Sequence, residues 1–170
     1  MVDESDMNEY IEPKKPQFDT KIGEVIELLK NAERPVIIAG NGITLADASN
    51  DFLQLIEKLN IPTVGTFARY DIIKNDSKYF FGRYGTVGNR MANFTVQNSD
   101  LIIAIGARLN VRAISYNWEY FGREALKVVV DIDAAELEKH TLSIDCKIKA
   151  DAKKFIVGLS DALENINLPS

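Results

Sequence analysis

Glycine-rich turns follow three of the four clearest hydrophobic runs, and they are the residues whose type and spacing best suit ligand chemistry. The turns are Gly40-Asn41-Gly42, Gly65-Thr66 and Gly106-Ala107-Arg108. If the runs are parallel strands, their carboxyl ends meet at one sheet edge, where open α/β folds bind ligands. Glycine keeps that edge free of side chains, so a flat or phosphorylated ligand can approach closely. Glycine also ends strands and forms tight turns, and for any single turn both explanations stay open.

A second glycine cluster precedes a predicted helix over residues 88–97. It is the segment Gly82-Arg83-Tyr84-Gly85-Thr86-Val87-Gly88. Backbone N–H groups at a helix start attract phosphate through hydrogen bonds and the helix dipole. Arg108 and Arg112 follow a strand directly and are candidates for bidentate phosphate contacts. Arg83 and Arg90 better fit surface ion pairs.

Two carboxylates, Asp131 and Asp133, close the fourth hydrophobic run. A carboxylate at this place can bind ribose hydroxyls or cap the following helix. Helix capping is a serious alternative for Asp133, since Ala134-Ala135-Glu136 follows it, and Asp131 is the better ligand candidate. No third ligand stands at a suitable spacing, so the pair does not predict a metal site.

Neither an NAD fingerprint nor a catalytic constellation is complete. Leu45 stands where the third fingerprint glycine belongs, and no acidic residue follows Gly65-Thr66 directly. The only histidine, His140, lies in a polar stretch, and the only cysteine, Cys146, fits a small buried hydrophobic residue. We therefore expect no active site in this chain and no catalysis by it alone. An aromatic cluster around Trp118 and Tyr120 predicts either core packing or a subunit contact.

The elements that must position these turns alternate between strand and helix. Continuous β-branched runs predict buried strands over residues 36–39, 61–65, 101–106 and 127–133, with a weaker fifth over 146–150. Helices are predicted from Asp19 or Thr20 onward and over residues 46–59, 88–97 and 155–166. The residues predicted to face inward are Ala48, Phe52, Leu55, Ile56 and Leu59 in the second helix, and Met91 and Phe94 in the third. This alternation predicts an α/β domain with a parallel sheet and helices on both faces.

Composition narrows the class of protein. The 170 residues carry a formal charge of −5 with scattered basic residues, which argues against nucleic-acid binding. One cysteine suits a reducing compartment, no run is long enough to cross a membrane, and the N-terminus does not resemble a signal peptide. We therefore expect a cytoplasmic protein with no membrane partner. Residues 1–17 are predicted to be a linker, 18–166 a domain, and 167–170 a tail.

Taken together, the strand ends resemble a known family. The segments Arg34–Gly42, Ile61–Thr66, Ser99–Arg108 and Val130–Asp133 are similar, in order and spacing, to the central domain of acetolactate-synthase-like enzymes that use thiamine diphosphate. The resemblance runs from about Asp19 to Leu163. It implies a three-layer, Rossmann-like α/β fold of the DHS-like NAD/FAD-binding type, with a six-stranded parallel sheet. It also implies flanking N- and C-terminal domains that bind thiamine diphosphate and Mg²⁺, in a parent enzyme that forms homo-oligomers. No Gly-Asp-Gly motif for that cofactor occurs in this chain.

In flavin-bearing members of this family the domain holds FAD structurally. The positions that the resemblance assigns to such a nucleotide are Gly40, Asn41, Gly42, Thr66, Phe67, Gly85, Thr86, Gly88, Gly106, Ala107, Arg108, Arg112, Asp131 and Asp133. Two positions depart from the flavin pattern: a Met-His pair is Thr86-Val87 here, and an Asp-Asp pair is Asn110-Val111. FAD, another adenine nucleotide and a vestigial cleft are thus all open. The alternatives from other classes are a self-sufficient NAD(P)-dependent oxidoreductase and a purely structural module.

Overall fold

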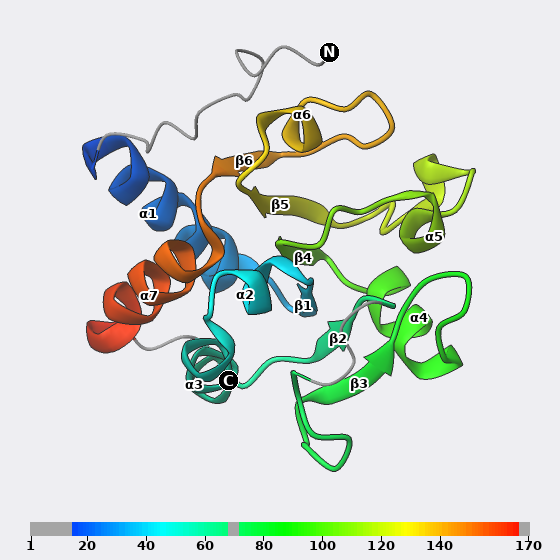
Figure 1. The fold of residues 1–170 in the computed structure, drawn as a ribbon, viewed down its shortest axis with the longest axis horizontal. Helices are drawn as coiled ribbons and strands as arrows, with labels where there is room; N and C mark the ends of the chain where they lie inside the picture. Colours follow the sequence, from blue (N-terminus) through cyan, green and yellow to red (C-terminus); the bar gives the residue numbers. More distant parts are fainter. Residues whose placement is uncertain (1–14, 68–71, 167–170) are drawn as a thin grey trace, which may run out of the picture.

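The computed structural model describes residues 15–67 and 72–166, and it shows a six-stranded sheet, parallel throughout (Figure 1). The strand order is β3-β2-β1-β4-β5-β6. The strands are β1 (Pro35–Ala39), β2 (Thr63–Gly65), β3 (Phe80–Arg83), β4 (Leu101–Ile105), β5 (Leu126–Asp131) and β6 (Cys146–Lys149). β1 and β4 pair along their full length, from Pro35 opposite Leu101 to Ala39 opposite Ile105. The predicted Rossmann-like fold is confirmed.

Helices cover both faces of this sheet, as Figure 1 shows. One face packs against α1 (Lys15–Asn31), α2 (Gly42–Leu45), α3 (Ser49–Leu59) and α7 (Ala152–Ala162). The other packs against α4 (Arg90–Gln97), α5 (Val111–Ile114) and α6 (Ala134–Leu137). Two short 3-10 turns, η2 (Trp118–Tyr120) and η3 (Leu163–Asn165), complete the described elements. Both faces of β1, β4 and β5 are thus buried, which explains their unbroken apolar sequences.

The structure corrects several element boundaries. α1 begins at Lys15, ahead of the predicted Asp19 or Thr20, because proline at position 16 is tolerated in the first helical turn. The predicted helix over residues 46–59 is α3 alone and begins at Ser49. β3 was not predicted from its own residues, since it is a partly exposed edge strand containing Gly82. Most of the predicted linker and the whole predicted tail lie outside the described residues.

The predicted inward face of α4 is wrong. Ala92 and Val96 are buried, whereas Met91 and Phe94 are 52% and 54% exposed. The Asn89 side chain accepts a hydrogen bond from the Ala92 amide at 2.8 Å and fixes where the helix starts. The small Ala92 allows close contact with the sheet. The second predicted helix is oriented as expected, with Ala48, Phe52, Leu55, Ile56 and Leu59 all buried.

Two other side-chain predictions can be compared with the structure. Cys146 is buried, as predicted, and burial raises the pKa of its thiol to about 11. Trp118 and Tyr120 are 38% and 60% exposed, so the aromatic cluster is not part of the core.

The turns that follow β1 and β4 pack backbone against backbone. The Gly40 amide donates to the Ile105 carbonyl and the Gly42 amide to the Gly106 carbonyl, both at 3.0 Å. A Cβ atom added to Gly40 would lie 2.0 Å from the Gly106 carbonyl oxygen, and one added to Gly42 would lie 2.7 Å from the Gly106 Cα. Glycine is required at these positions because protein backbone already occupies the space of a side chain.

We expect Gly40→Ala to lower the free energy of unfolding by about 1 to 3 kcal/mol, the usual cost of forcing an extra methyl group into packed backbone. Gly23→Ala is the matched control, because nothing lies within 4 Å of a Cβ atom added to this glycine of α1. The control should stabilise the protein by about 0.5 to 1 kcal/mol through helix propensity. Urea unfolding of both variants measures the difference. Equal stability of the two variants would contradict tight packing of the turns.

Candidate functional site

The carboxyl ends of β1 and β4 form the topological switch point of the sheet. The chain leaves β1 toward α2 and α3 on one face, and leaves β4 toward α5 on the other (Figure 1). In open α/β sheets the crevice at such a point is where ligands bind. The turns Gly40–Gly42 and Gly106–Arg108 flank it directly. The structure thus places the first group of predicted site residues at the switch point of the sheet.

Two further segments reach the same edge of the sheet. The Thr66 amide donates to the Ala39 carbonyl at 3.1 Å, which places the end of β2 beside the end of β1. Phe67 follows, 51% exposed, and the Arg112 guanidinium lies 6.0 Å from the centre of its ring. The Thr86 amide in turn donates to the Arg112 carbonyl at 2.9 Å. Residues from four loops are therefore neighbours at this edge.

In the glycine cluster at residues 85–88, the backbone amides of Gly85, Thr86 and Gly88 donate hydrogen bonds to acceptors within the protein. The Gly85 amide donates to the Asn93 side chain at 2.8 Å, and the Asn93 side-chain amide donates back to the Gly85 carbonyl. The Gly88 amide donates to the Gly85 carbonyl and the Asn89 amide to the Arg83 carbonyl. With Thr86 also paired, these amides do not form an open cradle for phosphate. An anion here would rely on side-chain donors.

Arg108 is drawn away from the switch point. Its Nε lies 2.7 Å from Glu136 Oε1 on α6, and its side chain is 73% exposed. Lys139 bonds the same glutamate and donates to the Arg108 carbonyl at 3.1 Å. Surface ion pairing thus describes Arg108, which the sequence had favoured as a phosphate ligand. Arg112, whose guanidinium lies near the Phe67 ring, is the candidate cation that remains at this edge of the sheet.

The two aspartates have different roles. Asp133 caps α6, because its Oδ1 accepts the Ala135 amide at 2.9 Å, which is the alternative that the sequence left open. Asp131 closes β5 and accepts the Asp133 amide at 3.0 Å. Burial raises the pKa of the Asp131 carboxyl above its usual value. Asp131 is therefore the stronger ligand candidate of the two, because its half-buried carboxylate lies at a strand end and its neighbours do not offset the cost of burying the charge.

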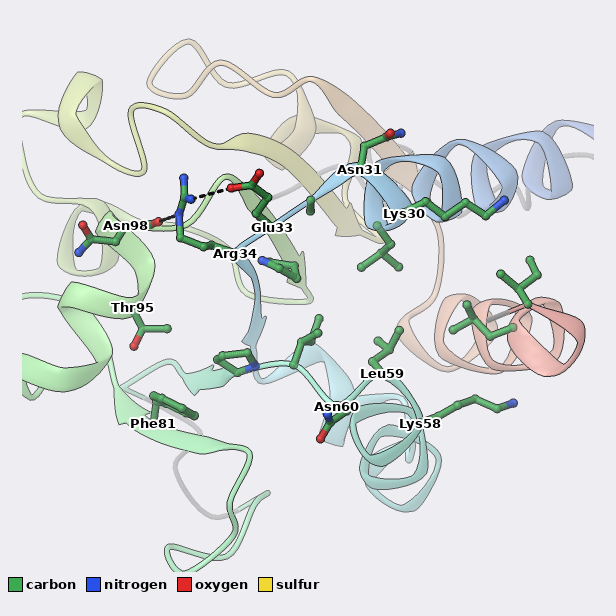
Figure 2. A pocket seen from close by; sticks show the side chains of 17 residues that line it. Lys30, Asn31, Glu33, Arg34, Lys58, Leu59, Asn60, Phe81, Thr95 and Asn98 are labelled. Carbon is green, nitrogen blue, oxygen red and sulfur yellow. Dashed lines mark hydrogen bonds and ion pairs between the residues drawn. The ribbon is translucent and has the colours of Figure 1, made fainter. Parts of the chain in front are cut away.

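A large hollow lies at the opposite edge of the sheet (Figure 2). It has a volume of about 1030 Å³ and is lined by residues such as Leu59, Phe81 and Arg34. None of the predicted site residues lines it. Its side chains come from the amino ends of the strands and the ends of α1 and α3, and no sequence motif signalled it. Its cations are engaged, since Arg34 Nε donates to the Asn98 carbonyl and Lys58 Nζ to the Ser160 carbonyl.

Elsewhere, the described residues form no cluster of metal-ligating side chains. His140 is exposed, and among residues 15–67 and 72–166 no group of three or more His, Cys, Asp or Glu could hold a metal ion. Within the same ranges no helix is both long and apolar enough to cross a membrane. The side chains at the switch point are of types suited to binding a ligand.

Comparison with known proteins agrees with this fold. Residues 22–159 match the family described as "Thiamine pyrophosphate enzyme, central domain". The chain is 34% identical to the probable acetolactate synthase large subunits of Methanococcus aeolicus and Methanocaldococcus jannaschii, over 86% and 89% of its length. It is 29% identical, over 88% of its length, to the 3D-(3,5/4)-trihydroxycyclohexane-1,2-dione hydrolase of Bacillus cereus (strain AH820). These alignments cover 24%, 25% and 23% of the relatives, so the chain spans about a quarter of their length. The chain belongs to the family of thiamine pyrophosphate enzyme central domains.

Proposed function

We propose that this chain is the non-catalytic middle domain of a thiamine-diphosphate-dependent carboligase or decarboxylase of the acetolactate synthase type. In such a parent enzyme, flanking domains bind thiamine diphosphate and Mg²⁺ and perform the chemistry. The family match supports this proposal, as do the acetolactate synthase large subunits among the relatives.

We also propose that the domain binds a nucleotide at the switch point. The observation that supports this is that residues from four loops are neighbours there. Arg112 and Phe67 combine a guanidinium, suited to a diphosphate, with an exposed ring, suited to a flat heterocycle. Asp131 lies at the end of β5, two strands from β1, where a carboxylate suits ribose hydroxyls. An adenine nucleotide such as FAD or ADP has these three parts, and we propose it as the ligand.

A purely structural domain is the second candidate, and one specific observation favours it. The amides of Gly40, Gly42, Gly85, Thr86 and Gly88 all donate to protein acceptors, and backbone fills the space beside Gly40 and Gly42. The glycines are therefore explained by packing alone. In this case the turns maintain the sheet, and the domain serves only to pack its neighbours.

Titration calorimetry with FAD and with ADP distinguishes the two candidates. If the domain binds a nucleotide, the titration should show saturable heat. Arg112→Ala should then lower the affinity at least tenfold, which equals about 1.4 kcal/mol of binding free energy. Arg123→Ala is the control, because Arg123 is exposed and pairs with Glu124 before β5, at the other edge of the sheet. No binding of either nucleotide at millimolar concentration would select the structural domain. Release of CO₂ from pyruvate by this chain, supplied with thiamine diphosphate and Mg²⁺, would overturn both.

Asp131→Asn should stabilise the domain while weakening nucleotide binding. The folded-state pKa of Asp131 lies above its usual 3.8, so folding disfavours the carboxylate. The wild type therefore loses stability as the pH rises from 3.8 through the folded-state pKa, and the asparagine variant does not. Urea unfolding at about pH 3 and pH 7 should show the variant gaining relative to the wild type at the higher pH. A carboxylate kept for packing would give the reverse: lower stability at pH 7 and unchanged ligand binding.

A further inference from the structure

Six successive exposed residues, Ser115–Tyr120, lie between α5 and β5, and we call them the aromatic loop. Three of the six are aromatic: Tyr116, Trp118 and Tyr120. Tyr116 is 81% exposed, more than any other large hydrophobic side chain in the described part of the chain. Figure 1 shows this yellow-green segment at the margin of the molecule, on the side away from α1 and α7. Tyrosine and tryptophan are enriched where proteins bind one another.

The aromatic loop is anchored at both ends. Ile114 precedes it and Phe121 follows it, and both are buried in the hydrophobic core beneath α4 and α5. Two hydrogen bonds of 3.1 Å close its 3-10 turn, from the Tyr120 amide to the Asn117 carbonyl and from the Phe121 amide to the Trp118 carbonyl. Ser115 starts the loop at φ 68° and ψ 178°, a conformation that is costly for any residue except glycine. The fold thus holds exposed rings in a fixed and strained segment, as is typical of functional loops.

A hollow of about 460 Å³ lies directly beside the aromatic loop. Its walls include Trp118 of the loop, residues 123–127 and residues 140–143. The Trp118 ring centre lies 6.4 Å from that of His140, so the loop and the opposite wall are in contact. Leu126, an exposed apolar residue, forms part of the wall. Projecting rings and a hollow that can receive a ring therefore lie side by side on one surface.

The charges on this surface are balanced. Residues 115–127 contain two acidic residues, Glu119 and Glu124, and two basic residues, Arg123 and Lys127. Arg123 Nε lies 3.5 Å from Glu124 Oε1, and both side chains are exposed. The whole chain carries a formal charge of −5, so two copies repel each other on average. A surface with both signs in equal number is one on which two copies can meet without opposing like charges.

We infer that the aromatic loop and the adjacent hollow form a twofold contact between two copies of this chain. Such a contact uses the same surface on both copies, so the surface must complement itself in shape and in charge. Tyr116 of each copy enters the hollow of the other, and Glu119 faces the partner's Arg123. The inference goes beyond the proposed function, because neither a nucleotide nor thiamine diphosphate takes part. The contact lies before β5, so it leaves the carboxyl edge of the sheet open in the dimer.

Trp118 is the only tryptophan of the chain and lines the hollow, so its fluorescence reports on this contact. As the 170-residue chain is concentrated from about 1 to about 200 µM, we expect sedimentation to show a monomer becoming a dimer. The emission of Trp118 should move to shorter wavelength over the same range. Tyr116→Glu should raise the dimer dissociation constant at least about tenfold. Phe94→Glu is the matched control, since it adds the same charge at an exposed aromatic residue of α4, and it should change neither readout.

A charge exchange tests the partner directly. Glu119→Arg and Arg123→Glu should each weaken the dimer at least about tenfold, because each leaves like charges facing across the contact. The double variant should return to within about threefold of the original dissociation constant, because both ion pairs form again with reversed sign. All four positions changed in these variants are exposed, and circular dichroism checks that each variant is folded.

Three results would each overturn the twofold contact. They are a chain that stays monomeric over the whole range, a dimer that forms without a shift in Trp118 emission, and a double variant that dimerises no better than its single variants. None of them bears on the proposed function, because nucleotide calorimetry reads the other edge of the sheet. Nucleotide affinity should be equal in the wild type and in Tyr116→Glu.

Discussion

Everything at the carboxyl edge of this domain depends on how closely the turns after β1 and β4 approach each other. The two strands are fully paired, and their hydrogen bonding continues past the strand ends through Gly40 and Gly42. No residue with a side chain fits at either position without displacing the backbone around Gly106. This contact lies at the centre of the sheet, between β1 and β4, where the connections after the two strands lead to opposite faces. It therefore fixes the positions of α2 and of the loop that leads to α5.

That close approach determines what kind of binding site the edge can offer. In phosphate-binding loops, backbone amides point outward to the ligand. Here the amides of Gly40 and Gly42 donate to carbonyls at the end of β4 instead. In the second glycine cluster, amides donate to the Asn93 side chain and the Arg112 carbonyl. The side chains of Phe67, Arg112 and Asp131 are therefore the groups at this edge that we expect to contact a ligand. The same glycines that suggest a ligand in the sequence serve the packing of the protein in the structure.

The sequence predicts those parts of the fold that burial imposes locally. β1, β4 and β5 lie between two helical layers, so their residues are continuously apolar and easily recognised. β3 lies at the sheet edge, where no such pattern is imposed, and it was found only through the family resemblance. The orientation of α4 was mispredicted because hydrophobicity favours burying Met91 and Phe94, whereas cap geometry and the close sheet contact bury Ala92 and Val96. The parallel direction of the strands was enough to predict that the candidate site residues lie at one edge of the sheet. The sequence could not predict whether the backbone amides of these residues are free, because their pairing depends on contacts between loops that are distant in sequence.

Asp100 has a consequence for the rigidity of the domain. Its carboxylate binds the amides of Glu33 and Arg34 ahead of β1, its own amide donates to the Arg34 carbonyl, and its carbonyl accepts the Leu126 amide at the start of β5. The central strands are thus fastened at their amino ends by one residue and at their carboxyl ends by the glycine turns. We expect amide protons of the central strands, between these two sets of hydrogen bonds, to exchange with solvent more slowly than those of the edge strand β3. The centre of the sheet is therefore the part of the domain that we expect to open last.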